Sequence, residues 1–342
     1  IEPGAVGTDA PWIVPGFVDI HCHGGGGGTF TTGDADQAVA AADFHAAHGT
    51  TTVVASLVSS PFEVMHAATL AYAPLVADGV LGGVHFEGPY LSEACCGAQN
   101  PAYLRDPSLD EIAALIEAGG ADTVRMMTIA PERPGALEAI RLLVEHGVVA
   151  AIGHTDATYR QTLDGVAAGA SVGTHVFNGM KPPHHRAPGP AYALLRSAGV
   201  VCEFVADGVH LADETLDFAL HTVGAGRAAL ITDAIAATGM ADGDYELGGQ
   251  DVRVSDGVAR LTTADGSPGS IAGSTLTMDA ALRRVARITG SIVDAVAAAS
   301  TVPARALGLT DRGALTPGAR ADIVTLSPEL EVVAVLRAGN RR

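Results

Sequence analysis

Eight short apolar stretches recur between residues 17 and 235, and segments with helical spacing separate them. The apolar stretches are rich in β-branched residues and lie at 17–23, 51–58, 81–88, 123–132, 148–155, 170–178, 200–208 and 228–235. Four of the segments between them (35–49, 109–119, 135–147 and 212–224) end in Gly, a residue that commonly follows the last turn of a helix. Strands that alternate with helices pair in parallel, so the sequence predicts an α/β fold.

Such strands can close into a barrel or remain an open, doubly wound sheet. An open sheet that binds a dinucleotide usually carries G-x-G-x-x-G after its first strand, and the glycine run at 24–28 matches only part of that pattern. Eight units without this fingerprint favour a (β/α)₈ barrel of the TIM type, which takes about 250 residues. The chain has 342 residues and is 48% hydrophobic, which is enough for a large core and a small satellite domain.

The pattern divides the chain into four segments. Residues 12–243 are predicted to form the barrel with its eight βα units. Residues 244–265 have short strands between turn residues, residues 266–312 have two helical patterns expected to pack on the barrel, and residues 313–342 have strands again. We expect 244–265 and 313–342 to belong to one small accessory β domain, completed by the opening segment or by residues before Ile1.

Charge and cysteine content argue against several classes of function. The net charge of −18 disfavours nucleic acids and anionic membrane surfaces as partners, because both require basic patches. No apolar run approaches the ~20 residues of a membrane-spanning helix, so no membrane partner is expected. The four cysteines are too scattered for a disulfide framework, and they favour a reducing, cytoplasmic location.

Polar residues occupy the ends of the predicted strands. Six of the eight strands end in, or are followed closely by, a histidine or a carboxylate: His21 and His23, Glu87, His154, His175, His210 and Asp233. In a β/α barrel the carboxyl ends of the strands meet at one face. We therefore expect these side chains to converge at one mouth of the barrel.

This set has the composition of a metal site. His21 and His23 are two residues apart on a strand, so both side chains point to the same face. Taken alone, each histidine is compatible with a structural role, and Asp233 with a helix N-cap. Together, imidazole and carboxylate groups suit a divalent ion such as zinc or iron, which lowers the pKa of a water to about 7. The remaining carboxylate can then accept and return a proton.

Several motifs resemble those of one family. PGFVDIHCHG (15–24) and LITDA (230–234) are similar to motifs of the wider amidohydrolase superfamily. HFEGP (85–89), GTHVFNGM (173–180) and GSIAGSTLTM (269–278) resemble more specific motifs of N-acetylglucosamine-6-phosphate deacetylases. The resemblance extends from Pro15 to the closing ADIVTL, and it implies a metal-dependent barrel hydrolase.

The resemblance also implies a ligand set. Glu87, His154 and His175 match the main metal ligands of the family. Some members have lost the His-x-His pair of the first strand and use one metal, whereas this chain retains His21 and His23. The resemblance therefore implies one or two zinc or iron ions per subunit, with Glu87 as a bridge where two are bound.

Further matching positions concern catalysis and the substrate. Asp233 matches the catalytic carboxylate. The substrate-binding positions are Gln99, Asn178, Gly179, Arg186 and His210. The resemblance implies that Arg186 reaches the partner's site in a homodimer. Gln99 stands where some relatives have a histidine, and its amide can still form a hydrogen bond with a sugar hydroxyl.

The expected reaction is hydrolysis of the acetamide of N-acetyl-D-glucosamine 6-phosphate, a small-molecule amino-sugar phosphate, to D-glucosamine 6-phosphate and acetate. Its place would be amino-sugar catabolism. Two alternatives within the superfamily are a deacetylase of N-acetylgalactosamine 6-phosphate and a hydrolase of a cyclic amide. A non-catalytic barrel relative that serves assembly is the alternative from another class, although such proteins usually lose the ligands that are retained here.

Overall fold

A central sheet of eight parallel strands organises the computed structural model, which describes residues 10–120, 122–263 and 265–341. Each strand pairs with the next one along the chain. The strands are β2 (Phe17–Cys22), β5 (Thr50–Val58), β6 (Gly83–Glu87), β7 (Val124–Ile129), β8 (Val149–Ile152), β9 (Val172–Gly173), β10 (Val201–Val205) and β11 (Ala228–Ile231). Every predicted strand is present, and the predicted (β/α)₈ barrel is confirmed.

Hydrogen bonds between β2 and the end of β11 close the barrel. The backbone N–H of Asp233 donates to the carbonyl of His21 at 2.9 Å. Beside it, the Thr232 hydroxyl donates to the carboxyl group of the fully buried Asp19 at 2.5 Å. Asp19 also accepts a hydrogen bond from the backbone N–H of Thr232 at 3.3 Å. The seam of the barrel therefore brings together two predicted site residues that are far apart in the sequence, His21 and Asp233.

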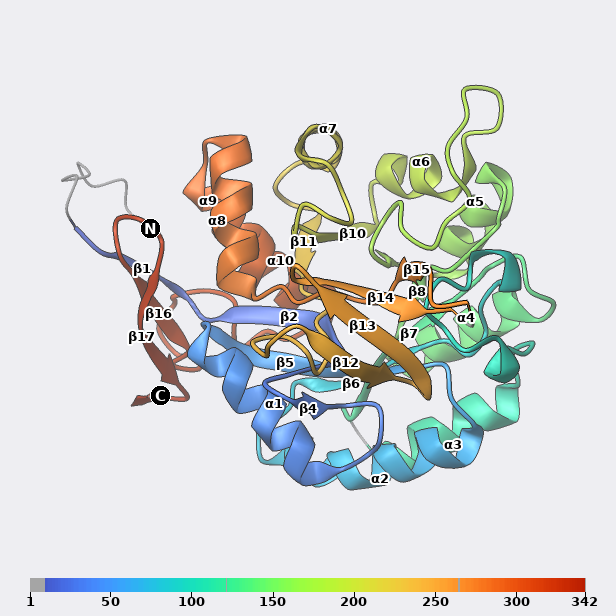
Figure 1. Ribbon diagram of the computed structural model, residues 1–342, viewed down its shortest axis with the longest axis horizontal. Coiled ribbons are helices and arrows are strands. Elements are labelled where there is room, and N and C mark those ends of the chain that lie inside the picture. Colours follow the sequence, from blue (N-terminus) through green and yellow to red (C-terminus); the bar gives the residue numbers. More distant parts are fainter. Residues whose placement is uncertain (1–9, 121, 264, 342) are drawn as a thin grey trace.

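Helices surround the barrel (Figure 1). Those that follow successive strands are α1 (Ala35–Ala47), α2 (Phe62–Ala77), α3 (Leu109–Gly119), α4 (Ala136–Glu145), α5 (Tyr159–Ala168), α6 (Gly189–Arg196) and α7 (Asp213–Val223). After β11 come α8 (Met278–Thr289), α9 (Ile292–Val296), a π-helical turn (Ala297–Thr301) and α10 (Val302–Ala306). Two 3₁₀ turns, Glu93–Cys95 and Pro101–Tyr103, lie in the loop after β6. None of the helices in the described ranges is long and apolar enough to cross a membrane.

Polar side chains explain where several of these helices begin. The Asp34 side chain accepts hydrogen bonds from the first backbone N–H groups of α1, and Ser108 does the same for α3. Thr158 and Gln161 form a reciprocal capping box at the start of α5. The helices predicted at 35–49, 109–119, 135–147 and 212–224 are confirmed as α1, α3, α4 and α7.

Two antiparallel sheets lie outside the barrel (Figure 1). One sheet consists of β1 (Trp12–Pro15), β16 (Ile323–Leu326), β17 (Val332–Arg337) and β18 (Asn340–Arg341). The other consists of β12 (Gly243–Leu247), β13 (Gln250–Ser255), β14 (Val258–Thr262) and β15 (Pro268–Ile271). A small hairpin of β3 (Gly24–Gly25) and β4 (Gly28–Thr29) follows β2.

The accessory β structure differs in one respect from the sequence-based expectation. Residues 244–265 and 313–342 were expected in one small β domain, but they form strands of separate sheets. The reason is that β12–β14 bury apolar side chains, among them Val252 and Val254, against Val58 and Ile235 of the barrel. The C-terminal strands pair instead with β1, so the opening segment completes their sheet. The segment boundaries at 243, 265 and 312 remain predictions.

The seam of the barrel leads to a test of stability. Thr232→Val keeps the shape of the side chain but removes the hydroxyl that donates to Asp19. We expect a loss of roughly 1–3 kcal/mol, because a buried carboxyl group loses a hydrogen-bond partner. Thermal unfolding of samples with matched metal content measures this loss. Thr222→Val on the exposed face of α7 is the control and should change stability by less than about 0.5 kcal/mol. An unchanged melting temperature for Thr232→Val would contradict the proposed role of this bond.

Candidate active site

A cavity of about 360 Å³ opens at the carboxyl ends of the barrel strands. Nine of the predicted site residues line it: His23, Glu87, Gln99, His154, His175, Asn178, Gly179, His210 and Asp233. His21 lies at its base and is fully buried, in contact with His23. Arg186 is the one predicted residue that the structure places away from the cavity of its own chain.

Glu87 lies at the centre of this site. It ends β6, and only 2% of its surface is exposed. Its Oε1 atom is 2.8 Å from His175 Nε2, 2.9 Å from His154 Nε2 and 3.6 Å from His21 Nε2. Its Oε2 atom is 3.2 Å from His23 Nε2. Four imidazole rings from three parts of the barrel therefore converge on one buried carboxylate.

Hydrogen bonds fix which nitrogen of each histidine faces Glu87. In all four rings Nδ1 lies close to an oxygen that accepts hydrogen bonds: Asn178 O for His175 (3.1 Å), Cys95 O for His154 (2.9 Å), Ser56 O for His23 (3.0 Å) and the Glu203 carboxylate for His21 (3.2 Å). Nδ1 therefore carries the hydrogen, and Nε2 of each neutral ring presents a lone pair toward the centre.

Lone pairs that face a carboxylate repel it unless a cation lies between them. Protons can supply positive charge here: burial alone lowers the pKa of His23, but its hydrogen bonds with Asp233 and Glu87 raise the pKa to about 9. A divalent ion would supply that charge instead, with the Nε2 atoms and Glu87 as ligands. The donor set of imidazole nitrogens and carboxylate oxygens fits zinc or iron.

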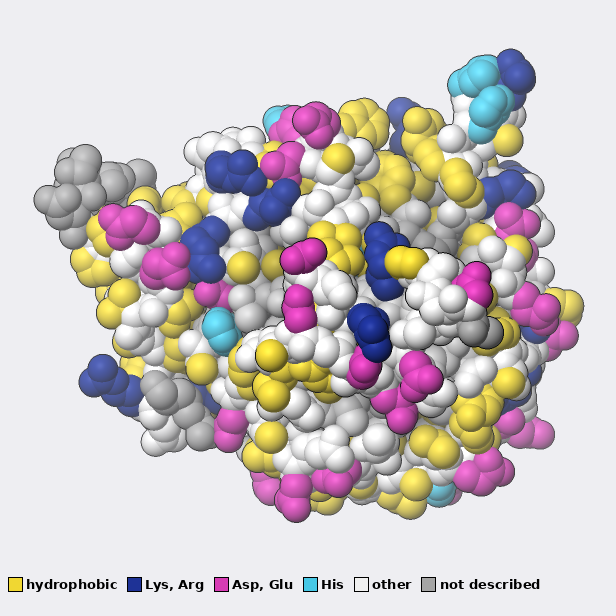
Figure 2. Space-filling view, in the orientation of Figure 1, with side chains coloured by type: hydrophobic (Ala, Val, Ile, Leu, Met, Phe, Trp, Pro, Cys, Tyr) yellow, Lys and Arg dark blue, Asp and Glu magenta, His cyan; other side chains and the backbone are white. Residues whose placement is uncertain are grey.

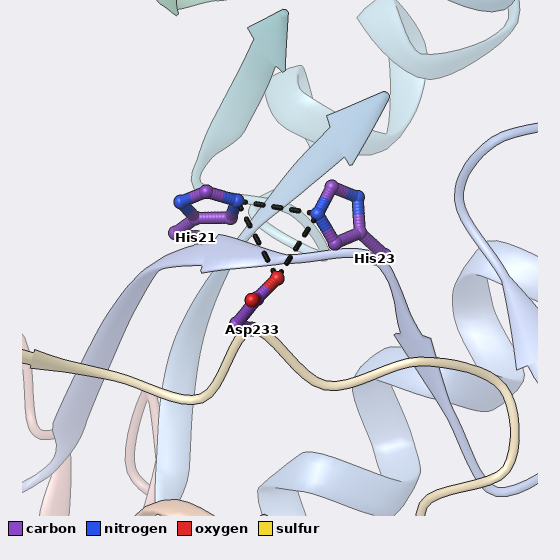
Figure 3. Close-up of side chains that lie close together, drawn as sticks. All are labelled: His21, His23 and Asp233. Atoms are coloured by element: carbon purple, nitrogen blue, oxygen red, sulfur yellow. Dashed lines mark hydrogen bonds and ion pairs between the residues drawn. The ribbon is translucent and has the colours of Figure 1, made fainter. Parts of the chain in front are cut away.

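A second group of ligand atoms lies across the seam of the barrel (Figure 3). His21 Nε2 and His23 Nε2 are 3.2 Å apart, and Asp233 Oδ1 is 3.2 Å from the latter and 3.7 Å from the former. The ligand atoms of His21, His23 and Asp233 lie within 4.8 Å of one another, as do those of His21, Glu87 and His175. His21 belongs to both groups, and its single Nε2 lone pair can bind one ion at a time.

Three site residues have an unusual backbone conformation. His154, His175 and Asp233 have φ angles of 45°, 24° and 52°, a region that residues with a Cβ atom rarely occupy. Such conformations cost about 1–3 kcal/mol each and persist where the surrounding structure holds them. Each of the three follows directly or closely after a barrel strand, where the chain turns its side chain over the mouth of the barrel.

The predicted substrate-binding residues other than Arg186 lie around the predicted metal ligands. Gln99 donates to Glu87 Oε2 at 2.7 Å and accepts from the backbone N–H of Ser59 at 2.7 Å, so its amide is already held beside the centre. At Gly179, φ is +57° and a Cβ atom would lie 2.7 Å from His154 Nδ1. Only glycine fits there without displacing a predicted metal ligand.

His210 is oriented by a neighbouring carboxylate. Its Nδ1 atom donates to Asp207 Oδ2 at 2.7 Å, and its Nε2 atom lies 3.9 Å from Asp233 Oδ2. The arrangement leaves Nε2 facing the cavity beside the predicted catalytic carboxylate. Asp207 was not among the predicted residues, although it stands three positions before His210.

Arg186 lies in the exposed loop between β9 and α6. Its guanidinium contacts His185 Nε2 at 2.7 Å. In the space-filling view, His and Lys or Arg side chains gather at the tip of a projecting segment near α6 (Figure 2). The loop carries Arg186 outward, and this residue does not line the cavity of its own chain. Its predicted contact with a partner's site stays a prediction.

Besides Asp207, two residues that support or line the site were not predicted from the sequence. Glu203 on β10 is fully buried, accepts from Nδ1 of His21, and also accepts from the backbone N–H of His175 at 3.2 Å. Its signal was a single carboxylate within the otherwise apolar strand VVCEFV. Arg260 on β14 lines the cavity, and no sequence signal placed the excursion 244–265 over the barrel mouth.

A barrel with a histidine–carboxylate centre at the carboxyl ends of its strands defines the class of metal-dependent barrel hydrolases. The amidohydrolase family matches residues 12–342 of this chain. The chain therefore belongs to the amidohydrolase family.

Relatives within this family are similar over nearly the whole chain. The N-acetylglucosamine-6-phosphate deacetylase of Lysinibacillus sphaericus is 35% identical over 341 residues, which cover 97% of this chain and 85% of the relative. The N-acetylgalactosamine-6-phosphate deacetylase of Escherichia coli O157:H7 is 36% identical over 341 residues, which cover 97% of this chain and 89% of the relative. Among solved structures, this chain is similar to a mutant of the N-acetyl-D-glucosamine-6-phosphate deacetylase from Mycobacterium smegmatis in complex with N-acetyl-D-glucosamine-6-phosphate. The TM-score is 0.93 at 48% sequence identity, and the match covers 97% of this chain and 87% of that structure's chain.

The contact between Glu203 and His21 leads to a test of metal binding. Glu203→Ala removes the acceptor that fixes Nδ1 of His21, and we expect metal affinity to fall by about 10–100-fold. Competition with a chelator, followed by metal analysis, measures the affinity and the number of ions per chain. Glu203→Gln keeps an oxygen acceptor and should recover most of the affinity. Glu246→Ala, an exposed carboxylate on β12, is the control. Wild-type affinity in Glu203→Ala would show that His21 needs no such support.

Proposed function

We propose that this chain hydrolyses the acetamide of N-acetyl-D-glucosamine 6-phosphate to D-glucosamine 6-phosphate and acetate, in amino-sugar catabolism. The observation that carries the proposal is the convergence of four histidines and two carboxylates on one cavity. Similarity to deacetylases over 97% of the chain supports the choice of an N-acetylated amino-sugar phosphate as substrate.

We infer that Glu87, His154 and His175 hold one divalent zinc or iron ion, and that His21 and His23 hold a second where two are bound, with Glu87 as the bridge. When bound, the metal supplies a water of lowered pKa and polarises the amide carbonyl. The directed Nε2 lone pairs described above support this assignment.

Asp233 is the proposed acid–base catalyst. Burial raises the pKa of Asp233, but the hydrogen bond with His23 and the nearby His21 outweigh burial and lower it to about 2. The carboxylate is therefore ionised at neutral pH and can accept a proton from the attacking water. Hydrolysis forms the C–O bond of acetate and breaks the C–N bond, and Asp233 returns the proton to the departing amine.

His210 and the other predicted residues hold the substrate in this proposal. Burial lowers the pKa of His210, but Asp207 and Asp233 raise it more strongly, so the protonated ring can donate from Nδ1 to Asp207 and from Nε2 to a substrate oxygen. Gln99, Asn178 and Gly179 line the cavity around the metal ligands. The exposed position of Arg186, away from its own cavity, supports the hypothesis that it reaches the site of the partner in a homodimer.

The second candidate function is deacetylation of N-acetylgalactosamine 6-phosphate. Its support is the 36% identity with an N-acetylgalactosamine-6-phosphate deacetylase, which is close to the 35% identity with the glucosamine enzyme of Lysinibacillus sphaericus. A non-catalytic relative is disfavoured because the predicted ligands meet at one centre. We place the reaction in the cytoplasm, which the four free cysteines support.

Acetate release tests the proposed function. We expect the protein to release acetate from N-acetylglucosamine 6-phosphate, to lose this activity on chelation, and to regain it with zinc or iron, because the Nε2 lone pairs and Glu87 need a cation. N-acetylgalactosamine 6-phosphate is measured in parallel, and the substrate with the higher kcat/KM is the preferred epimer. No acetate from either substrate with any metal would contradict the proposal.

A mixing experiment tests both Asp233 and the proposed homodimer. Asp233→Asn should lower kcat by about 10²–10⁴-fold, the usual contribution of acid–base catalysis. Arg186→Ala should also impair activity, but through the partner's site. After subunit exchange, an equal mixture of the two variants should recover about a quarter of wild-type activity, since one site in each mixed dimer has both residues intact.

Size-exclusion chromatography with light scattering provides the control for this mixture, because the prediction requires a dimer that exchanges subunits. Activity no higher than the average of the two separate variants, in a mixture shown to contain mixed dimers, would mean that Arg186 does not act across the interface. Normal turnover by Asp233→Asn would reject Asp233 as the base.

A further inference from the structure

The sheet β12–β15 forms part of the wall of the cavity. Leu247, Arg260, Ser270 and Ile271 from this sheet line the cavity together with the residues at the strand ends. The catalytic group and the metal ligands come from the barrel itself, so this wall contributes a separate set of contacts. Lys and Arg side chains are visible over β13 and β14 in the space-filling view (Figure 2).

Arg260 is the only lysine or arginine among the described residues that line the cavity. Its side chain is half-buried, and Nη1 donates to the carbonyl of Gly269 at 3.2 Å. In the part of the chain that the structure describes, no carboxylate forms an ion pair with it. A guanidinium without an acidic partner is notable in a chain with a net charge of −18.

The residue opposite Arg260 on the neighbouring strand is also a cation, so it cannot neutralise the charge of Arg260. Arg253 on β13 lies directly across from Arg260 in the strand register. Like charges in that position repel each other. Arg253 is exposed and forms two hydrogen bonds with the carboxylate of Asp244, at 2.6 and 2.9 Å, whereas Arg260 has no such bond. The pair thus contains one neutralised cation and one cation that faces the cavity.

Arg260 also lies on the His210 side of the cavity. Burial and the positive charge of Arg260 both lower the pKa of His210, although Asp207 and Asp233 raise it more strongly. The charge of the guanidinium therefore reaches the part of the cavity where His210 projects. In an N-acetylated sugar 6-phosphate the amide on C2 and the phosphate on C6 lie on opposite sides of the ring. With the amide at the metal ligands, the phosphate would be held away from them, near the cavity wall.

We propose that Arg260 binds the 6-phosphate of the substrate and thereby supplies a phosphate-binding cation from the same chain as the catalytic residues. This inference rests on the proposed function, in which the substrate is a phosphorylated amino sugar. A guanidinium forms charge-assisted, often bidentate hydrogen bonds with phosphate, which a neutral side chain cannot replace. Recognition of the phosphate then begins within the single chain, before any contribution from the partner's Arg186.

Steady-state kinetics of Arg260→Gln tests this assignment. We expect KM for N-acetylglucosamine 6-phosphate to rise by about 10–100-fold, the size of one hydrogen bond to a charged group, with little change in kcat. Hydrolysis of N-acetylglucosamine without phosphate should be unaffected. Arg253→Gln, which removes a cation from the same sheet outside the cavity, is the matched control and should leave KM unchanged. A KM that is unchanged for the phosphorylated substrate, or an equal loss with both substrates, would overturn the proposal.

Two further measurements keep the result interpretable. Arg260→Lys keeps the charge without the bidentate geometry and should raise KM less than Arg260→Gln. It becomes the deciding variant if Arg260→Gln melts at a lower temperature than Arg253→Gln. Calorimetry with glucosamine 6-phosphate then separates this inference from the proposed function. Binding that depends on Arg260 supports the inference even if the wild type releases no acetate, and equal binding by wild type and Arg260→Gln overturns it.

Discussion

The active-site geometry depends on one electrostatic conflict at the centre of the barrel mouth. Glu87 is buried, and the Nε2 atoms of His154 and His175 lie within 3 Å of its Oε1 atom. The outer nitrogen of each ring is held by an acceptor, so the inner nitrogen of the neutral ring points a lone pair at a negative oxygen. Such an arrangement is stable only with positive charge at its centre. The geometry therefore favours positive charge at this point, which protons or a divalent ion can supply.

The barrel provides the rigidity that this arrangement needs. His21 lies on the first strand of the barrel and Asp233 closely after the last, and the hydrogen bonds that close the barrel place them side by side. The strained backbone at His154, His175 and Asp233 is tolerated because the strands beneath these residues are buried on both faces. A site assembled on strand ends can thus hold several ligands in fixed positions without relying on long loops.

Elements outside the barrel complete the wall of the cavity. The sheet β12–β15 packs its apolar residues on Val58 and Ile235, and this contact positions Leu247, Arg260 and Ile271 at the cavity wall. The loop that carries Arg186 projects away from the cavity of its own chain. The cavity wall is therefore shared in the fold: the predicted metal ligands lie at the strand ends, and the sheet β12–β15 adds Leu247, Arg260 and Ile271 to the residues of the barrel loops.

The sequence by itself determined the barrel and most of the residues of the candidate site. The reason is that strands alternating with helices have few arrangements open to them, and the ends of parallel strands always meet at one face. Histidines and carboxylates at those ends therefore had to converge. Only the tertiary structure decided the contact between Glu203 and His21, which are 182 residues apart, and the separation of the two accessory sheets. These features depend on how side chains from distant segments pack against each other, and no local period or motif in the sequence encodes that packing.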